Sequence, residues 1–388
     1  MGSALQTPAE PAARVVGRVG RSDGPTLVVT AGIHGNEPAG VLAAQRVLGE
    51  LADRGTALRG EFVALRGNRA GLARETRFLD EDLNRLWTAE RLAALHARPG
   101  ALDHAEQREQ RELLAELEPL LARERVTLLD LHSTSGGGPP FALAGDTLHN
   151  RPVAFALGVP FLLGLEENVS GTLVEHVGAL GHVAVVIEGG QSSDPRTVEL
   201  LESALWITLV TSGVAAAEDV TGLELHRERL RSAARGLPAV IEVAHRRDIA
   251  PEDEQRFEML PGFEGFARIE RGTLLAHAGG GRERPVHAPF DGILLMPRYQ
   301  RQGRDGFFLG RSVSPLWVSL SAVLRRLHLE RALGLLPGVR IAERAGHVLV
   351  VDRRIARFFA AGLFRLLGYR RSEECGHELV VSRRNDRL

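Results

Sequence analysis

The stretch TLVVTAGIHGNEP, residues 26–38, organises the rest of this chain. Its β-branched apolar run, Leu27–Val29, ends at a glycine-containing turn, and short apolar runs bounded by glycine are typical of buried parallel strands. His34 and Glu37 follow that strand three residues apart. Open α/β sheets bind their ligands at the carboxyl ends of the strands, so we expect this turn to carry a functional site. An imidazole and a carboxylate are two of the three protein ligands that a catalytic zinc needs.

Two further apolar runs end in side chains that would complete such a site. Residues 126–131 precede His132, and residues 182–187 precede Glu188. His132 would be the third zinc ligand if its strand lies beside the first, which α/β topology favours. Glu188 would be the general base, because a carboxylate beside the activated water can take its proton and pass it to a leaving amine. Each residue alone is more often an ordinary loop or turn residue. Their coincidence at three strand ends favours the site.

A segment without clean periodicity, residues 67–87, is dense in charged, Gly and Asn residues. Long irregular segments inside a compact domain are usually functional or disordered. Arg77, Asn84 and Arg85 are therefore candidates for binding substrate anions or the developing oxyanion, since guanidinium groups pair with carboxylates in a two-pronged geometry. The alternative is that these arginines form surface ion pairs with the acidic residues 80–82.

Composition narrows the classes of protein. The 388 residues are 44% hydrophobic and 25% charged, with a formal net charge of -1. The near-zero charge argues against a general electrostatic affinity for nucleic acid or membrane. The chain has no lysine, which removes Schiff-base and P-loop lysines, and one cysteine, Cys375, which removes an intramolecular disulfide and a cysteine-based zinc finger. The sequence shows neither the pattern of a secretory signal nor an apolar segment long enough to span a membrane, so we expect a cytoplasmic protein.

The pattern along the chain divides it into four parts. Residues 1–13 read as a flexible N-terminus, and residues 14–217 alternate strands and helices, as in an α/β domain with a mostly parallel sheet. Residues 236–315 have short strands and many glycines, which indicates a small β-domain. Residues 316–388 read as an α+β appendage, in which two similar segments, 346–354 and 376–384, flank an amphipathic helix over 355–367.

The motifs HGNE, DLNR, DLHS and IEGG, in this order, resemble the succinylglutamate desuccinylase/aspartoacylase family of the zinc carboxypeptidase-like superfamily. The resemblance covers about residues 14–215, and residues 236–315 resemble the family's capping domain. It implies an α/β fold with a mixed sheet flanked by helices, and hydrolysis of the amide between an acyl group and an amino acid or related amine. One Zn²⁺ per chain would be held by His34, Glu37 and His132. Glu188 would be the base, and Arg77, Asn84 and Arg85 would bind the substrate or polarise its carbonyl group.

The chain departs from the family pattern at one position. Members that act on acyl-aspartate have an arginine about ten residues before the base, where this chain has Gly178. Tyr299 would correspond to a substrate-binding tyrosine of the family or be an ordinary hairpin residue. We expect a small N-acyl amino acid as the substrate and no nucleic acid or membrane partner, and a homo-oligomer stays open. The competing functions are a zinc carboxypeptidase acting on peptides and a non-catalytic scaffold with the same fold.

Overall fold

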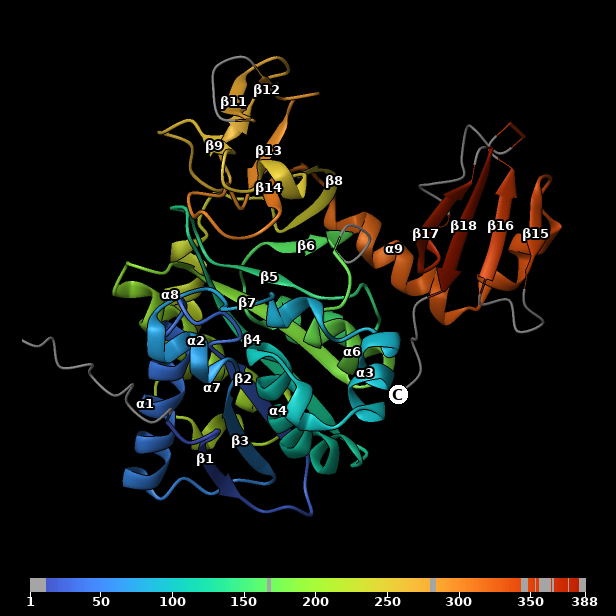
Figure 1. The fold of residues 1–388 in the computed structure, drawn as a ribbon. Coiled ribbons are helices and arrows are strands. Elements are labelled where there is room, and N and C mark those ends of the chain that lie inside the picture. Colours follow the sequence, from blue (N-terminus) through green and yellow to red (C-terminus); the bar gives the residue numbers. More distant parts are fainter. Residues whose placement is uncertain are drawn as a thin grey trace, which may run out of the picture.

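The computed structural model describes residues 12–165, 169–279, 284–342, 348–352, 354–355, 364, 366–375 and 377–383. Within these residues, eleven strands form one mixed sheet at the centre of the molecule (Figure 1). In spatial order they are β1 (Val15–Gly20), β3 (Glu61–Arg66), β2 (Thr26–Ala31), β4 (Val126–Thr134), β7 (Val183–Gln191), β5 (Phe141–Leu143), β6 (Phe161–Leu163), β8 (Val240–Asp248), β14 (Asp305–Ser312), β13 (Gly292–Leu295) and β10 (Arg268–Ile269).

Helices cover both faces of this sheet. One face packs against α1 (Ala39–Arg54), α5 (Asn150–Ala156), α7 (Arg196–Thr211) and α8 (Leu223–Ala233); the other packs against α3 (Ala89–Ala97), α4 (Ala105–Leu121) and α6 (Leu173–Ala179). On β2, Leu27 and Val29 pack into the first layer and Val28 into the second, and all three are fully buried. This double burial explains why the strand is a continuous apolar run instead of an alternating one. The expected α/β class, with a mixed sheet flanked by helices, is confirmed.

The turn after β2 depends on two glycines. Gly32 has φ +70°, a left-handed conformation that side chains other than that of glycine rarely adopt. Gly35 lies so close to the next layer of backbone that an added Cβ would be 2.0 Å from the carbonyl carbon of Gly71. Its amide also donates to the carbonyl of Arg77 at 3.1 Å. The HGNE turn is therefore locked against the segment that follows β3.

The register of the parallel strands brings the predicted site residues together. β4 lies between β2 and β7, with Ala31 opposite Leu131. One residue further along β4, His132 lies opposite Glu188 of β7. The sequence predicted that the strands end just before His132 and Glu188, but both residues lie inside their strands. The segment 67–87, expected to be irregular, contains the short helix α2 (Arg69–Arg74) and the 3₁₀ turn η1 (Leu83–Arg85).

The β-rich segment that follows α8 continues the central sheet. β8 pairs with β6, and β14, β13 and β10 add to it in antiparallel order. The remaining short strands form a second sheet at the top of Figure 1. They are β9 (Glu258–Met259), β11 (Leu274–His277) and β12 (Pro285–His287), and the 3₁₀ turn η5 (Pro251–Asp253) precedes them. We call residues 240–312 the cap.

We call the described residues from 315 to 383 the C-terminal unit. It begins with α9 (Pro315–Arg326), which follows the cap, and its sheet stands to one side of the rest of the molecule (Figure 1). The 3₁₀ turn η6 (Leu329–Leu335) leads from α9 into a sheet with the order β15 (Val339–Ile341), β16 (Val348–Asp352), β18 (Glu378–Arg383) and β17 (Tyr369–Cys375). The two similar segments of the sequence supply β16 and β18, which pair directly. The amphipathic helix expected over 355–367 lies largely outside the described residues.

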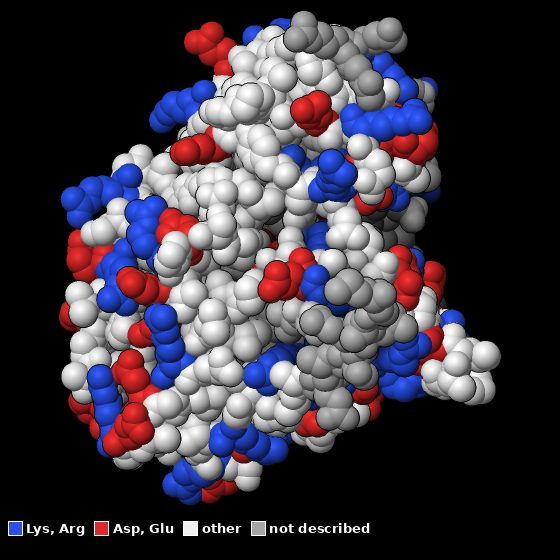
Figure 2. Space-filling view, turned by 60° about the vertical axis from the view of Figure 1, so that its left-hand side comes forward, with Lys and Arg blue, Asp and Glu red and all other residues white. Residues whose placement is uncertain are grey.

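The surface shows no single dominant charge on the face drawn in Figure 2, where arginines and acidic residues are interspersed. Among the described helices, none combines the length and the apolar composition needed to cross a membrane.

Candidate active site

Three predicted ligands meet at the carboxyl end of the central strands. His34 and Glu37 come from the turn after β2, and His132 comes from β4. One ligand atom from each lies within 4.8 Å of the others, and all three residues are buried. The Glu37 carboxylate is 2.9 Å from His34 Nδ1 through one oxygen and 3.1 Å from His132 Nδ1 through the other. Both Nδ1 atoms therefore face the same carboxylate.

A second carboxylate orients each imidazole from the other side. Asp130 Oδ2 lies 2.9 Å from His132 Nε2, and Asp82 Oδ1 lies 3.2 Å from His34 Nε2. Asp130 is itself fixed by the hydroxyl of Thr30, which donates to it at 2.6 Å. When each Nε2 donates its proton to an aspartate, the Nδ1 lone pairs point at the space beside Glu37. Metal-binding histidines show this arrangement, so the cluster fits a divalent cation of the zinc type.

The electrostatics of the cluster also favour a cation. Burial opposes charge on Glu37, but His34 and His132 outweigh it and hold the pKa of that carboxyl below its ordinary value. Burial would lower the pKa of His132, yet Asp130 and Glu37 raise it well above 6.5. The carboxylates that favour a proton on His132 equally favour a metal ion that replaces it.

Among the described residues, Glu188 is the carboxyl group of the site for which no hydrogen-bond partner is found. It is 9% exposed, and in the described part of the chain its Oε2 has no hydrogen-bond partner. Burial raises its pKa; His132 opposes this rise and Glu37 adds to it, which leaves a pKa of about 7. A carboxyl group with a pKa near neutrality can both accept and release a proton under physiological conditions.

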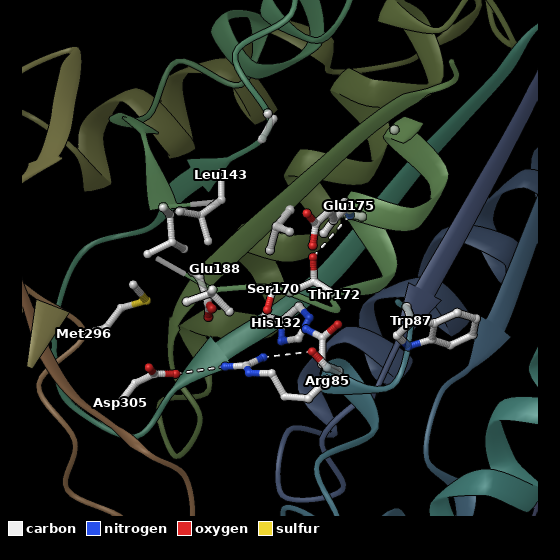
Figure 3. Close-up of a pocket in the computed structure, with 18 of the residues that line it drawn as sticks. Arg85, Trp87, His132, Leu143, Ser170, Thr172, Glu175, Glu188, Met296 and Asp305 are labelled. Carbon is white, nitrogen blue, oxygen red and sulfur yellow. Dashed lines mark hydrogen bonds and ion pairs between the residues drawn. The ribbon is translucent and has the colours of Figure 1, made fainter. Parts of the chain in front are cut away.

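The cluster lies in a cavity of about 670 Å³. Figure 3 shows Glu188 and His132 on one side of it, with Met296 and Asp305 of the cap across from them. Its lining combines polar residues with an apolar section in which six side chains pack together, namely Leu143, Leu165, Val169, Val174, Val186 and Phe308. A cavity of this size suits a small molecule.

Arg77, Asn84 and Arg85 all line this cavity. Arg77 is an ion-pair partner of both Glu37, at 3.5 Å, and Asp82, at 3.1 Å, so the predicted pairing with a nearby acid is real but buried inside the site. Its Nε has no hydrogen-bond partner among the described residues. The side-chain oxygen of Asn84 already has a partner within the protein, because Oδ1 accepts a hydrogen bond from the amide of Leu173 at 3.0 Å.

Arg85 is held by the cap. Its Nη2 lies 2.8 Å from Asp305 Oδ2, which the dashed line in Figure 3 marks. The sequence indicated no role for Asp305, since 220 residues separate the two partners. Gln300 is a second cap residue that sequence reasoning missed; its side-chain oxygen accepts from Asn36 at 3.0 Å. The cap thus contacts the HGNE turn and η1.

Tyr299 does not take the place expected of a substrate-binding residue. It is not among the residues that line the cavity. Its hydroxyl lies 2.9 Å from the carbonyl of Leu260 and 2.8 Å from that of Phe263, both within the cap. This position matches the alternative expectation, an ordinary residue of the cap loops, although the backbone amide of Tyr299 donates to the hydroxyl of the cavity residue Ser135 at 3.2 Å.

Residues 23–204 match the model of the succinylglutamate desuccinylase/aspartoacylase catalytic domain. These residues therefore form a catalytic domain of this family. The matched segment contains the whole cluster, from His34 to Glu188, and stops short of the cap and the C-terminal unit. Deacylase-type hydrolysis is the activity of the family. No curated protein sequence matches the chain.

Solved structures of family members share the fold. The chain is similar to succinylglutamate desuccinylase from Vibrio cholerae, with 17% identity and a TM-score of 0.54 over 76% of this chain and 83% of the other. It is equally similar to the ectoine utilization protein EutE (DoeB) from Ruegeria pomeroyi in its product-bound structure, with 19% identity and a TM-score of 0.54 over 76% and 87%. An aspartoacylase family protein from Mesorhizobium loti has 18% identity and a TM-score of 0.52, over 76% of this chain and 88% of the other.

Proposed function

We propose that this protein is a zinc-dependent amidohydrolase that cleaves the amide of an N-acyl amino acid or related N-acyl amine. The observation that carries the proposal is the position of Glu188. Glu188, whose Oε2 has no hydrogen-bond partner among the described residues, lies on the strand next to His132 and lines the same small-molecule cavity as the His34, Glu37 and His132 cluster. Membership in a family of deacylases supports the reaction class.

The proposed division of labour follows from the contacts. His34, Glu37 and His132 would hold one zinc ion, which when bound lowers the pKa of water to about 7 and polarises a carbonyl group. Glu188 accepts a proton from the attacking water as the water oxygen bonds to the acyl carbon. It then donates that proton to the nitrogen as the carbon–nitrogen bond breaks. The products are a carboxylic acid and an amine, so atoms and charge balance.

Arg77 and Arg85 supply positive charge to the same cavity. Arg77 lines the cavity with its terminal nitrogens held by Glu37 and Asp82, so its positive charge would stabilise the negative charge that develops on the carbonyl oxygen. Arg85 is positioned by Asp305 at the cap side of the cavity. The apolar section of the cavity would take an aliphatic part of the substrate.

Amine release by the zinc-loaded protein tests this function. The panel contains N-acetyl and N-succinyl amino acids together with a blocked dipeptide, and each reaction is run with and without a chelator. Turnover of the acyl amino acids that the chelator abolishes is the expected result. Turnover of the dipeptide alone would assign a peptidase, and a chain that neither binds zinc nor releases amine would be a scaffold.

Two variants make the metal assignment specific. His132→Ala is expected to lose both zinc and turnover. His176→Ala is the matched control, because His176 lines the same cavity outside the cluster and should keep its zinc. A His132→Ala protein with one zinc per chain would contradict the proposed ligand set.

A further inference from the structure

The C-terminal unit is fixed to the wall of the active-site cavity by buried polar contacts. Arg151 of α5 donates to the hydroxyl of Ser321 on α9 at 3.0 Å. In the opposite direction Arg325 of α9, 1% exposed, lies 3.3 Å from the carboxylate of Asp146 and donates to its carbonyl at 2.8 Å. The chain neighbours of Asp146 line the cavity. The unit is therefore anchored where it can contribute to the site.

Two arginines of this unit lie in the cavity lining. They are Arg370 of β17 and Arg383 of β18. Arg370 Nη1 is 3.2 Å from Glu175 Oε1, and its Nε donates to the hydroxyl of Ser382 at 3.3 Å. Its Nη2 makes no hydrogen bond to any part of the chain that the structure describes. A guanidinium has five N–H donors in a planar fork, so Arg370 keeps donors for another anion.

Open space lies next to this ion pair. Glu175 and Gly178 are three residues apart on α6, which places them on the same side of the helix. Both line the cavity, and a Cβ added at Gly178 would meet no atom within 4 Å. The Glu175 carboxylate also accepts a hydrogen bond from the amide of Gly171, which donates to its Oε2 at 2.9 Å. An anion in this space would face Arg370 across a helix surface that has no side chain at Gly178.

Arg370 is also more accessible than the arginines nearer the cluster. Its side chain is 36% exposed, compared with 13% for Arg77 and 29% for Arg85. Arg77 has two acidic partners in the site. Arg298, a cap residue that lines the cavity, donates hydrogen bonds to four backbone carbonyls. Arg370 has one acidic contact and one contact to a hydroxyl.

We infer that the C-terminal unit completes the active site, and that Arg370 binds a carboxylate of the substrate in the space above Gly178. The inference rests on the proposed function for the identity of the ligand as an N-acyl amine. A guanidinium binds a carboxylate through two parallel hydrogen bonds, which gives orientation as well as affinity. Arg370 is then a specificity-determining residue, and the reaction itself occurs at the cluster, which lines the same cavity.

Three compounds would show which half of the substrate carries the carboxylate that Arg370 binds: one without a carboxylate and two with a single carboxylate at opposite ends. N-propionyl-isoamylamine has none, N-propionyl-L-leucine adds one to the amine half, and N-succinyl-isoamylamine adds one to the acyl half. For each, KM and kcat are measured with the zinc-loaded protein. Binding is measured by calorimetry in the background of Glu188→Gln, so that affinity is read without turnover.

The variants Arg370→Gln and Glu175→Gln separate substrate binding from a merely structural contact. Arg370→Gln is expected to raise KM and Kd about 10- to 100-fold for the compound whose carboxylate Arg370 binds. Its kcat for that compound, and its KM and Kd for the uncharged compound, should change little. Glu175→Gln frees Arg370 from its acidic partner and is expected to lower that Kd. If the ion pair only held the two parts together, both variants would weaken binding alike.

Two further variants serve as control and rescue. Arg340→Gln breaks an ion pair with Glu378 on the same C-terminal sheet and should change nothing. Gly178→Arg, placed in the open space of the cavity, should restore carboxylate preference to the Arg370→Gln protein.

The outcomes for the inference and for the proposed function are distinguishable. Absence of amine release from every compound would refute the proposed function, while calorimetry would still report on Arg370. Wild-type carboxylate affinity in Arg370→Gln, equal weakening by both ion-pair variants, or no carboxylate binding by the parent protein would each overturn the inference.

Discussion

The buried carboxyl of Glu188 has a consequence for stability that can be measured without substrate. Its pKa rises from the ordinary 4.5 to about 7 in the folded, metal-free protein. Between these values the unfolded chain ionises while the folded chain stays protonated, so folding loses stability as pH rises. The pKa shift spans about 2.5 pH units, and each unit corresponds to about 1.4 kcal/mol. Ionisation of Glu188 in the unfolded chain therefore lowers the free energy of unfolding by about 3 kcal/mol above pH 7.

Glu188→Gln removes this titration and keeps the shape of the side chain. In metal-free protein we expect no difference in the free energy of unfolding from wild type at pH 4.5. The variant should become more stable by about 1.4 kcal/mol per pH unit and reach a plateau of about 3 kcal/mol near pH 7. The same variant should retain zinc and lose about 10²- to 10⁴-fold in turnover, because the base is not a ligand.

Urea unfolding from pH 4.5 to 8 measures the effect, with the buried Trp87 and Trp206 as fluorescent reporters. Glu175→Gln is the control, since that carboxyl lies in the same cavity but is paired with Arg370, and it should give no comparable gain. A stability difference for Glu188→Gln that stays constant across this pH range would refute the reasoning. Full turnover by the variant would refute its role as the base.

Three other perturbations test the supporting contacts. Asp130→Asn should lower zinc affinity about 10- to 100-fold through misorientation of His132, as measured by competition with a chromophoric chelator. Asp305→Asn removes the cap's charged contact with Arg85, and a loss of about 2 kcal/mol predicts a rise in KM of about 30-fold in steady-state kinetics. Arg325→Met breaks the buried network under α9 and should cost about 3–5 kcal/mol in urea unfolding; an unchanged midpoint would show that the anchor is dispensable.

The sequence was most informative where the structure is most regular. Parallel strands buried on both faces appear as predominantly apolar runs, so β2, β4 and β7 could be recognised, and with them the polar residues towards their ends. The adjacency of these strands then brought His34, Glu37, His132 and Glu188 together. Local spacing and one topological rule were sufficient for this part of the site.

The parts of the site that come from distant segments could not be predicted in this way. Arg85 and Asp305 are 220 residues apart, and Glu175 and Arg370 are 195 apart. Pairing between an arginine and an acidic residue depends on tertiary packing, and this chain offers 48 arginines and 49 acidic residues as candidate partners. Tyr299 is a further case, since its place in the sequence left two roles open and did not predict that its hydroxyl packs against the carbonyls of Leu260 and Phe263.

The continuous sheet determines how a substrate can reach the cluster. Cap strands β8, β14 and β13 are hydrogen-bonded into the same sheet as the catalytic strands, and Asp305 begins β14. A cap built in this way cannot rotate as a rigid lid without breaking backbone hydrogen bonds. We therefore expect the sheet-bonded strands of the cap, with Asp305 at the cavity, to keep the same position with and without a bound product, so that substrates are selected by size and charge without the closure of a rigid lid.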